Sequence, residues 1–525
     1  MKQTIEKQTD LHRIVSSTYL VLLGILLPLA VHHAYYDITL TKAYVFWILS
    51  GGLLFASVFC LLLAEKESLF RTPPAAADIL FSVFALCHII STLIFRTIPG
   101  GFLASDNRYQ GVLSFLLYLC CFFYLRRNGR FSPLVRFSWM LGMGLMSLSA
   151  IAEVFGADPI GLRAVSPERQ LMRFLSLVGN ISFVSAMCVL FLPLAGWYAL
   201  SAEKWQKSWP YILCALLALC AGLASRAESF VLGTLFFLAV LPVMTRDPQV
   251  LGRIPLMWAS TAAVSGLFAA LMRAEALYPP SDLAVVLCAP APALFFVVIS
   301  AALFLFMRKK SESQIMQLRR VYLLLLSIFF VSGLVFLFLA NTVWRDSLPA
   351  SIASVAVFSP SWGTDRGAEW QSFWQMFLAS PLPQKLIGSG AGSLAAWDRT
   401  HRLFSDAVTD SAHNEYLHYL LTGGIIGLGA YLTLLGLSLR EALCCLSREK
   451  TALALACAAY AVQAVVNIAQ PFTTPLFFAL LALLTGSGEA EEAESEIFPF
   501  LCILLIALAV LVLLAGMLMS RAGAA

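Results

Sequence analysis

Charged residues are scarce in this chain. Only 12% of its 525 residues are Asp, Glu, Lys or Arg, while 60% are hydrophobic and the mean hydropathy is +0.82. Soluble domains carry about twice that charged fraction. A water-soluble protein of this length needs more polar surface than these residues supply. The composition therefore excludes a large soluble helical protein and indicates an integral membrane protein.

Several cofactor-binding patterns are also missing. No Cys-x-x-Cys occurs, and the cysteines lie within or beside apolar runs, where small side chains pack helices. No Asp-x-Asp occurs, so a metal-bridged nucleotide-sugar site has no evident ligands. The glycines from Gly388 to Gly392 are not followed by the Lys-Ser or Lys-Thr of a phosphate-binding P-loop. We expect no metal, no cofactor and no nucleic-acid partner.

Long apolar runs make up most of the chain. Each is bounded by charge, Pro or Gly and has the length of a membrane-spanning helix. We expect an all-α polytopic membrane protein with about 14–15 transmembrane helices. The runs lie near 15–34, 43–64, 79–95, 111–125, 134–152, 181–200, 210–224, 229–244, 254–272, 283–307, 321–340, 416–439, 451–468, 472–486 and 497–519.

These runs predict four parts of the chain. Residues 1–340 contain transmembrane helices 1–11. A long loop at 341–415, with an interfacial helix expected near 366–380, precedes the twelfth span. Residues 416–486 contain transmembrane helices 12–14, and 487–525 contain an acidic linker and a last transmembrane helix.

The basic residues predict the orientation. More than half of the 35 lysines and arginines lie at the N-terminus and in alternate short loops, and such residues stay on the cytoplasmic side. The first run lacks a small-residue cleavage site, so we expect a retained helix rather than a removed signal peptide. This predicts a multi-pass protein of the cytoplasmic (inner) membrane with a cytoplasmic N-terminus. The outward loop at 155–180 and the loop at 341–415 then face outward.

The interiors of the expected spans contain no Asp, Glu, Lys or Arg. Ion-coupled transporters bind a proton or Na⁺ partway across the membrane and need such residues there. No pair of matching halves with helices broken by Gly and Pro is visible either. We therefore expect the chemistry at the outer surface, in the long loops. A flippase or exporter of lipid-linked saccharides is the alternative, and it predicts a charged cavity within the spans.

Four large aromatic residues are spaced along one face of a helix in the long loop. Trp370, Phe373, Trp374 and Phe377 follow the i, i+3, i+4, i+7 pattern. Tryptophan-rich amphipathic helices lie in the membrane interface, where a lipid-linked substrate presents its phosphates. The stripe is equally compatible with packing of the loop on the rest of the protein, and the two interpretations do not exclude each other.

The most informative pattern is Ser411-Ala-His413-Asn414-Glu-Tyr416-Leu-His418, followed by Thr422-Gly423-Gly424-Ile-Ile-Gly427. His413 lies where the long loop enters the twelfth span, so it meets water while anchored on a rigid helix. Gly423 and Gly427 form a small-xxx-small pair that lets another helix approach closely. His413 and His418 are five residues apart and lie on different faces, which does not match a zinc pattern.

At these residues the sequence resembles the O-antigen ligase and O-antigen polymerase superfamily. That family carries His, then Asn, Ser or Gln, nine residues, Gly, two residues and Gly; His413, Asn414, Gly424 and Gly427 fit that spacing. The resemblance spans about residues 35–486. Ile181 and Ser182 depart from it, since the family usually has Pro and Asn there. Further similar stretches are Arg108-Tyr-Gln-Gly111, Gly179-Asn180, Ser225-Arg226-Ala227 and the run of Arg366, Trp370, Pro381, Gly388 and Gly390.

The resemblance implies a metal-independent membrane glycosyltransferase of the C-type group. Its donor would be an undecaprenyl-diphosphate-linked glycan on the outer face of the membrane, and its acceptor a glycan, lipid or protein. A ligase, a polymerase and a protein O-oligosaccharyltransferase share the core motif, so all three stay open. The expected process is cell-envelope polysaccharide biosynthesis, such as that of lipopolysaccharide.

The resemblance also suggests which residues bind the donor. The departing pyrophosphate develops negative charge, which needs cationic stabilisation. Arginine suits it because its planar fork binds phosphate oxygens in pairs and stays charged. We expect Arg366 and Arg226 to bind the pyrophosphate, with Arg108 and Arg173 as further candidates.

The general base is predicted from the same motif. Histidine exchanges protons near neutral pH, so His413 can accept the proton of the attacking hydroxyl. Asn414 would orient the histidine or a sugar hydroxyl. The expected structural glycines are Gly388, Gly390, Gly424 and Gly427. The alternative bases are Glu369, Asp365, Asp406 and Asp410.

Overall fold

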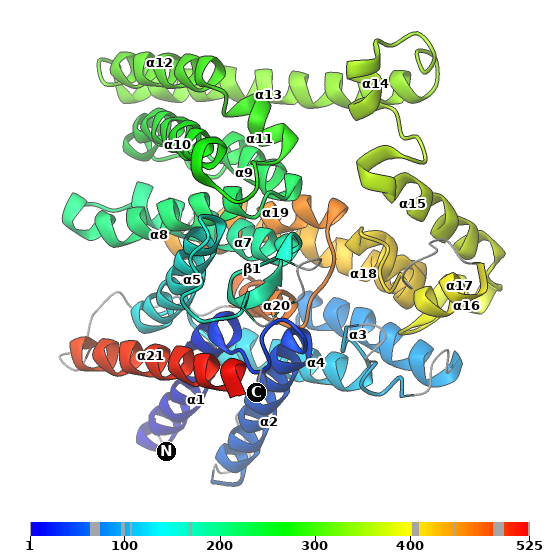
Figure 1. The fold of residues 1–525 in the computed structure, drawn as a ribbon. Helices are drawn as coiled ribbons and strands as arrows, with labels where there is room; N and C mark the ends of the chain where they lie inside the picture. Colours follow the sequence, from blue (N-terminus) through cyan, green and yellow to red (C-terminus); the bar gives the residue numbers. More distant parts are fainter. Residues whose placement is uncertain are drawn as a thin grey trace.

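The computed structural model is a bundle of helices (Figure 1). It describes residues 2–63, 74–95, 100–104, 108–164, 166, 171–401, 409–445, 447–486 and 498–522. Within these residues the strands are the two-residue pair β1 (Phe174–Leu175) and β2 (Gly179–Asn180), which run antiparallel around the turn η2 (Ser176–Val178). Asp406 and the acidic linker at 487–497 lie outside the described residues.

The helices follow the apolar runs of the sequence. The helices before the long loop are α1 (Lys2–Leu29), α2 (Ile38–Leu63), α3 (Ala76–Phe95), α4 (Val112–Asn128), α5 (Pro133–Val154), α7 (Ile181–Leu200), α8 (Trp205–Ala224), α9 (Glu228–Val240), α10 (Pro248–Glu275), α11 (Asp282–Leu287), α12 (Pro290–Met307) and α13 (Glu312–Asn341). The loop and the last part contain α14 (Ala350–Ala356), α15 (Trp362–Ala379), α16 (Leu382–Ile387), α17 (Ser393–His401), α18 (Glu415–Cys445), α19 (Arg448–Gln463), η3 (Ala464–Val466), α20 (Thr473–Leu484) and α21 (Phe498–Ala522).

Twelve helices among the described residues are long and apolar enough to cross a membrane. The expected spans at 111–125, 229–244 and 472–486 form the shorter helices α4, α9 and α20. Each apolar run of the sequence therefore contains a helix, although the run at 283–307 is divided into α11 and α12. The expectation of an all-α polytopic membrane protein is confirmed.

The central helices and the peripheral helices differ sharply in burial. In α7, 94% of the span is buried inside the protein, against 6% in α13 and 17% in α12 and α21. Figure 1 shows α12 and α13 along one edge of the molecule and α21 along another. Apolar helices that are exposed in this way match a lipid environment, since water would not cover them favourably.

Some charged side chains are buried at the ends of the helices, outside the interiors of the expected spans. The helices start earlier or end later than the apolar runs, and so they include ionisable residues. Asp78 accepts hydrogen bonds from Arg126 and Arg127 at 3.1 and 3.3 Å. The fully or almost fully buried ionisable groups at span ends are Lys42, Asp78, Arg136, Glu153 and Glu415.

Two of these buried groups, Glu153 and Lys42, are paired locally. Glu153 accepts from the hydroxyls of Tyr35 and Ser149 and from the backbone N–H of Ser176, at 2.6–2.8 Å. Lys42 donates to the carbonyl oxygen of Pro28 at 3.0 Å. Such contacts tie helix ends to neighbouring segments. They account for the burial of Glu153 and Lys42.

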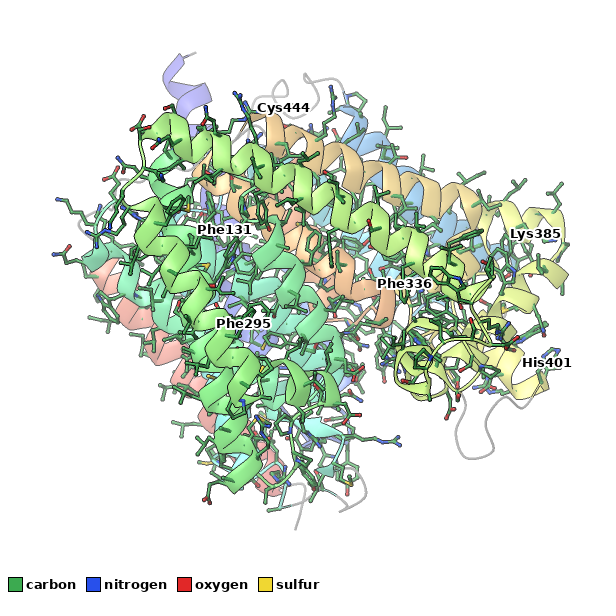
Figure 2. The ribbon with its side chains drawn as sticks, turned by 90° about the horizontal axis from the view of Figure 1, so that it is seen from above. Phe131, Phe295, Phe336, Lys385, His401 and Cys444 are labelled. Atoms are coloured by element: carbon green, nitrogen blue, oxygen red, sulfur yellow. The ribbon has the colours of Figure 1, made fainter. Side chains whose placement is uncertain are left out.

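The long loop is folded into α14 to α17, which gather at one end of the bundle. Figure 1 places them beside the last turn of α13 and the start of α18, and we call this the loop end of the molecule. In Figure 2 the loop residues Lys385 and His401 lie at this end, whereas Cys444 lies far from them on α18. The candidate site therefore sits on secondary structure rather than on an irregular connection.

Candidate functional site

The aromatic face of α15 packs mainly on the protein itself. Phe373 is fully buried and Phe377 nearly so, in a cluster with Leu394, Ala412 and Leu421. Trp370 donates from Nε1 to the carbonyl of Ala412 at 2.9 Å. These contacts show that the stripe packs the loop on the protein, while Trp374 is 48% exposed and its place in the membrane interface stays a prediction. Its consequence is that α15 holds the segment just before His413 in place.

His413 is paired with a buried carboxylate. Its Nδ1 lies 2.8 Å from Oε2 of Glu369 on α15, and the Glu369 side chain is 10% exposed. Since a carboxylate accepts, the shared proton belongs to Nδ1, and this tautomer leaves Nε2 as an acceptor in the neutral ring. The His413 side chain is 35% exposed, so the ring remains accessible. Glu369 is thus placed to orient the histidine ring.

The backbone at His413 is held in an unusual conformation. His413 has φ of 45°, in the left-handed region that residues other than glycine rarely adopt. Asn414 follows directly, and its side-chain oxygen accepts from the backbone N–H groups of Tyr416 and Leu417, both at 3.0 Å. Asn414 is therefore the N-cap of α18. This cap holds the backbone of the preceding residue, His413, against the start of the helix.

Arg366 lies one helical turn before Glu369 on α15. It is half-buried and interacts electrostatically with Glu369 and with Glu228, the first residue of α9. Burial lowers the pKa of Arg366, and the two carboxylates oppose that shift. A guanidinium beside the His413–Glu369 pair can bind an anion that reaches the histidine.

Arg226 lies in the turn between α8 and α9, with φ of 56°. Its guanidinium donates to the backbone carbonyl of Met172 and lies 4.6 Å from the ring centroid of Tyr278. Burial lowers its pKa, Tyr278 raises it, and the nearby Arg163 lowers it. Two guanidinium groups in mutual interaction favour the binding of an anion between them.

Arg163 is a residue that sequence reasoning did not select for the site. Its loop is shaped by Asp158, whose carboxylate accepts from the backbone N–H groups of residues 161 to 164 at 2.9–3.0 Å. The signal in the sequence is weak, because a lone Asp before Gly161 is common in turns. Only the folded loop brings Arg163 towards Arg226.

The other two expected arginines are placed differently. Arg108 forms a bidentate ion pair with Asp410, at 2.9 Å from Nε and 2.7 Å from the terminal nitrogen. Arg108 therefore ties the 108–110 turn to the segment 409–412 before His413 through Asp410. Arg173 is exposed beside the β1–β2 hairpin, where its carbonyl accepts from Ile181. Asp365 is exposed in the first turn of α15.

The expected structural glycines lie at close backbone contacts. Gly388 and Gly390 have φ of 91° and 82°, and a Cβ on Gly388 would overlap the backbone of Thr422. Gly424 has φ of 72° and forms a kink inside α18, against Leu386 and Gly388. The turn 388–392 is therefore docked into the kink of α18.

The small-xxx-small pair, Gly423 and Gly427, packs closely against another helix, as the sequence predicted. Gly423 packs against the ring of His88, and Gly427 against Cys87, both on α3. The prediction of a close helix neighbour at Gly423 and Gly427 is confirmed. His418 is buried beneath this site, and its Nδ1 has no hydrogen-bond partner among the described residues.

Within the described residues, no group of three or more His, Cys, Asp or Glu side chains is arranged to hold a metal ion. The titratable groups that come together are instead a histidine, carboxylates and arginines. This set can exchange a proton and bind an anion.

The bundle and the site define a class of protein: a polytopic membrane protein with a histidine–carboxylate pair and arginines at one end of its helices. Residues 285–432 match the family described as O-antigen ligase. This region of the chain is thus similar to the O-antigen ligase family, and the match confirms the resemblance that the sequence motifs indicated. It contains Arg366, Glu369 and His413, as well as Gly424 and Gly427. No curated protein matches the chain.

Proposed function

We propose that the chain is a membrane glycosyltransferase of the O-antigen ligase or polymerase type. Its donor is a glycan linked to undecaprenyl diphosphate, its acceptor carries a hydroxyl group, and the loop end faces the outside of the cytoplasmic membrane. The observation that supports this best is the His413–Glu369 pair with Arg366 one turn away on the same helix. The family match supports a role of the ligase or polymerase type.

In the proposed reaction, Nε2 of His413 accepts the proton of the acceptor hydroxyl as its oxygen attacks the anomeric carbon of the donor sugar. The bond from that carbon to the pyrophosphate oxygen breaks, and its electron pair leaves with the pyrophosphate. Glu369 keeps Nδ1 protonated and stabilises the imidazolium that forms. A carboxylate beside a histidine has this role in other enzymes that use histidine as a base.

The arginines stabilise the leaving group in this proposal. Arg366 and Arg226 bind the pyrophosphate oxygens, and Arg163 adds charge beside Arg226. Arg108 positions the segment before His413 through its ion pair with Asp410 instead of binding the donor directly. Because each guanidinium is already charged, the charge of the transition state is met without a metal ion.

The test is complementation of a deletion strain with wild type, His413→Ala or His413→Gln, followed by gel analysis of surface glycan and of lipid-linked glycan. We expect both variants to be present at wild-type level, to leave mature glycan unrestored and to accumulate lipid-linked donor. Single repeats would identify a polymerase, and long unattached chains a ligase. Restoration of the wild-type profile by His413→Ala would exclude this mechanism and favour a flippase or exporter.

A further inference from the structure

Two apolar cavities are lined mainly by α8, α9 and α10. The larger has a volume of about 640 Å³ and the smaller about 350 Å³. Leu219, Leu238 and Thr261 line both, so the two cavities are neighbouring parts of one apolar groove. We call it the α8–α10 groove.

The groove begins beside the proposed pyrophosphate site. Leu223 and Phe230 line its near end. Leu223 precedes Arg226 by three residues, and Phe230 follows Glu228, which interacts with Arg366, by two. A ligand with its anionic group at Arg226 therefore has its apolar part directly at the entrance of the groove.

The groove runs through most of the thickness of a membrane. Along α8 its lining residues extend from Ser208 to Leu223. At 1.5 Å per residue this is about 22 Å, compared with a hydrocarbon core of about 30 Å. At the far end Arg253 lines the wall and donates to the carbonyls of Leu200 and Ala202 at 3.3 and 2.8 Å.

The side of the groove opens towards the surface of the bundle. Leu256 and Phe296 line it and are about half exposed, at 50% and 51%. Both belong to helices whose spans are mostly exposed, with 33% of α10 and 17% of α12 buried. A long apolar chain can thus enter sideways from the membrane without passing through the bundle.

From these contacts we propose that the α8–α10 groove binds the polyprenyl tail of the lipid-linked donor. The inference rests on the proposed function, because it takes the pyrophosphate to be bound at Arg226 and Arg366. Three observations select this occupant: the groove starts at the cationic site, its lining is apolar, and it is long enough for a chain that crosses much of the membrane. The contacts along the tail add affinity and direct the pyrophosphate towards His413.

The test combines variants that fill the groove with donors whose tails differ in length. Thr261→Trp places a large side chain where the two cavities meet, and Ala215→Phe fills the larger one. Leu267→Trp is the matched control, because Leu267 is on α10 and 73% exposed. Each purified full-length protein is assayed in detergent with a donor carrying a 55-carbon tail and with one carrying a ten-carbon tail.

With the long donor, we expect the two filled variants to raise KM at least tenfold at similar kcat, while Leu267→Trp behaves as wild type. With the ten-carbon donor the difference from wild type should fall below twofold, and this also shows that the variants are folded. Equal KM values for all proteins with the long donor would overturn the groove proposal but leave the transferase intact. If wild type transfers from neither donor, the proposed function itself fails.

Discussion

His413 is constrained from three directions, and each constraint comes from a different part of the chain. Glu369 holds its ring, Asn414 caps the helix that follows it, and Trp370 holds the carbonyl of Ala412 just before it. A histidine with φ of 45° persists only where neighbours over-determine it. The contacts of these three side chains thus set the orientation of the proposed base.

Replacement of the orienting carboxylate should slow the reaction. Glu369→Gln keeps the size of the side chain but removes the charge that stabilises the imidazolium, so we expect kcat to fall about 10²-fold or more with little change in KM. Steady-state kinetics with the long donor measure this. Asp365→Asn, in the same helix but exposed, is the control and should behave as wild type. A loss in Asp365→Asn with normal Glu369→Gln would make Asp365 the base.

Arg366 should be sensitive even to a conservative change. Lysine retains the charge but not the planar fork, so we expect Arg366→Lys to be clearly impaired and Arg366→Ala to lose about 10²–10³ in kcat. Donor turnover by purified protein measures both. Arg345→Ala serves as the control because Arg345 is exposed in the same loop. Equal activity of Arg366→Ala and wild type would remove this arginine from the proposed site.

At the scale of elements, the turn 388–392 and the kink of α18 fit together through glycine. Gly388 donates its N–H to the carbonyl of Gln384 at 2.8 Å, and Ser389 donates to Leu421 at 2.8 Å. The kink at Gly424 bends α18 around this turn. Since His413 directly precedes the N-cap of α18, the fit of these two elements determines where the site lies relative to α3.

Gly388→Ala should destabilise this junction. Its φ of 91° is unfavourable for alanine by about 1–2 kcal/mol, and overlap with Thr422 adds to this. We expect a lower unfolding temperature in detergent, measured by fluorescence-detected thermal unfolding. Gly429→Ala is the matched control on α18, since an added Cβ there meets nothing within 4 Å. If both variants unfold at the wild-type temperature, the contact with Thr422 is not required.

At the scale of the whole molecule, α18 connects two opposite ends. It begins at the site and runs to the exposed residues Cys444 and Cys445, while the loop helices cover only the other end (Figure 2). Because α18 is long and apolar enough to cross a membrane, we predict that the site and the Cys444 end lie on opposite sides of it. The basic residues of the sequence predict that the site side is outside.

Cysteine labelling tests that orientation. His401→Cys, in a variant with Cys444 and Cys445 replaced by Ser, should react with a membrane-impermeant maleimide in intact cells, or in spheroplasts where an outer membrane blocks access. Wild-type Cys444 should react only in inside-out vesicles, because it is exposed at the other end. The reverse pattern would place the site in the cytoplasm and exclude a donor bound at the outer face.

The sequence by itself determined the class of fold and the central motif. Apolar runs of membrane-spanning length specify helices one by one, because each satisfies its own backbone hydrogen bonds in lipid. The spacing from His413 to Gly427 pointed to the family, and the small-xxx-small pair correctly predicted a close helix neighbour. These are local properties of the chain, so they can be predicted from the sequence without knowing how the helices pack against one another.

Only the tertiary structure decided how the site is assembled. Glu369 and His413 are 44 residues apart in sequence, and Arg108 and Asp410 are 302 apart, so neither partner was identifiable from spacing. The long-range fold turned Glu369 from one possible base into the partner of His413, engaged Arg108 and Asp410 with each other, and brought Arg163 to Arg226. The reason is that electrostatic partners are selected by distance in space, which the packing of α15, α18 and the turns at the loop end sets.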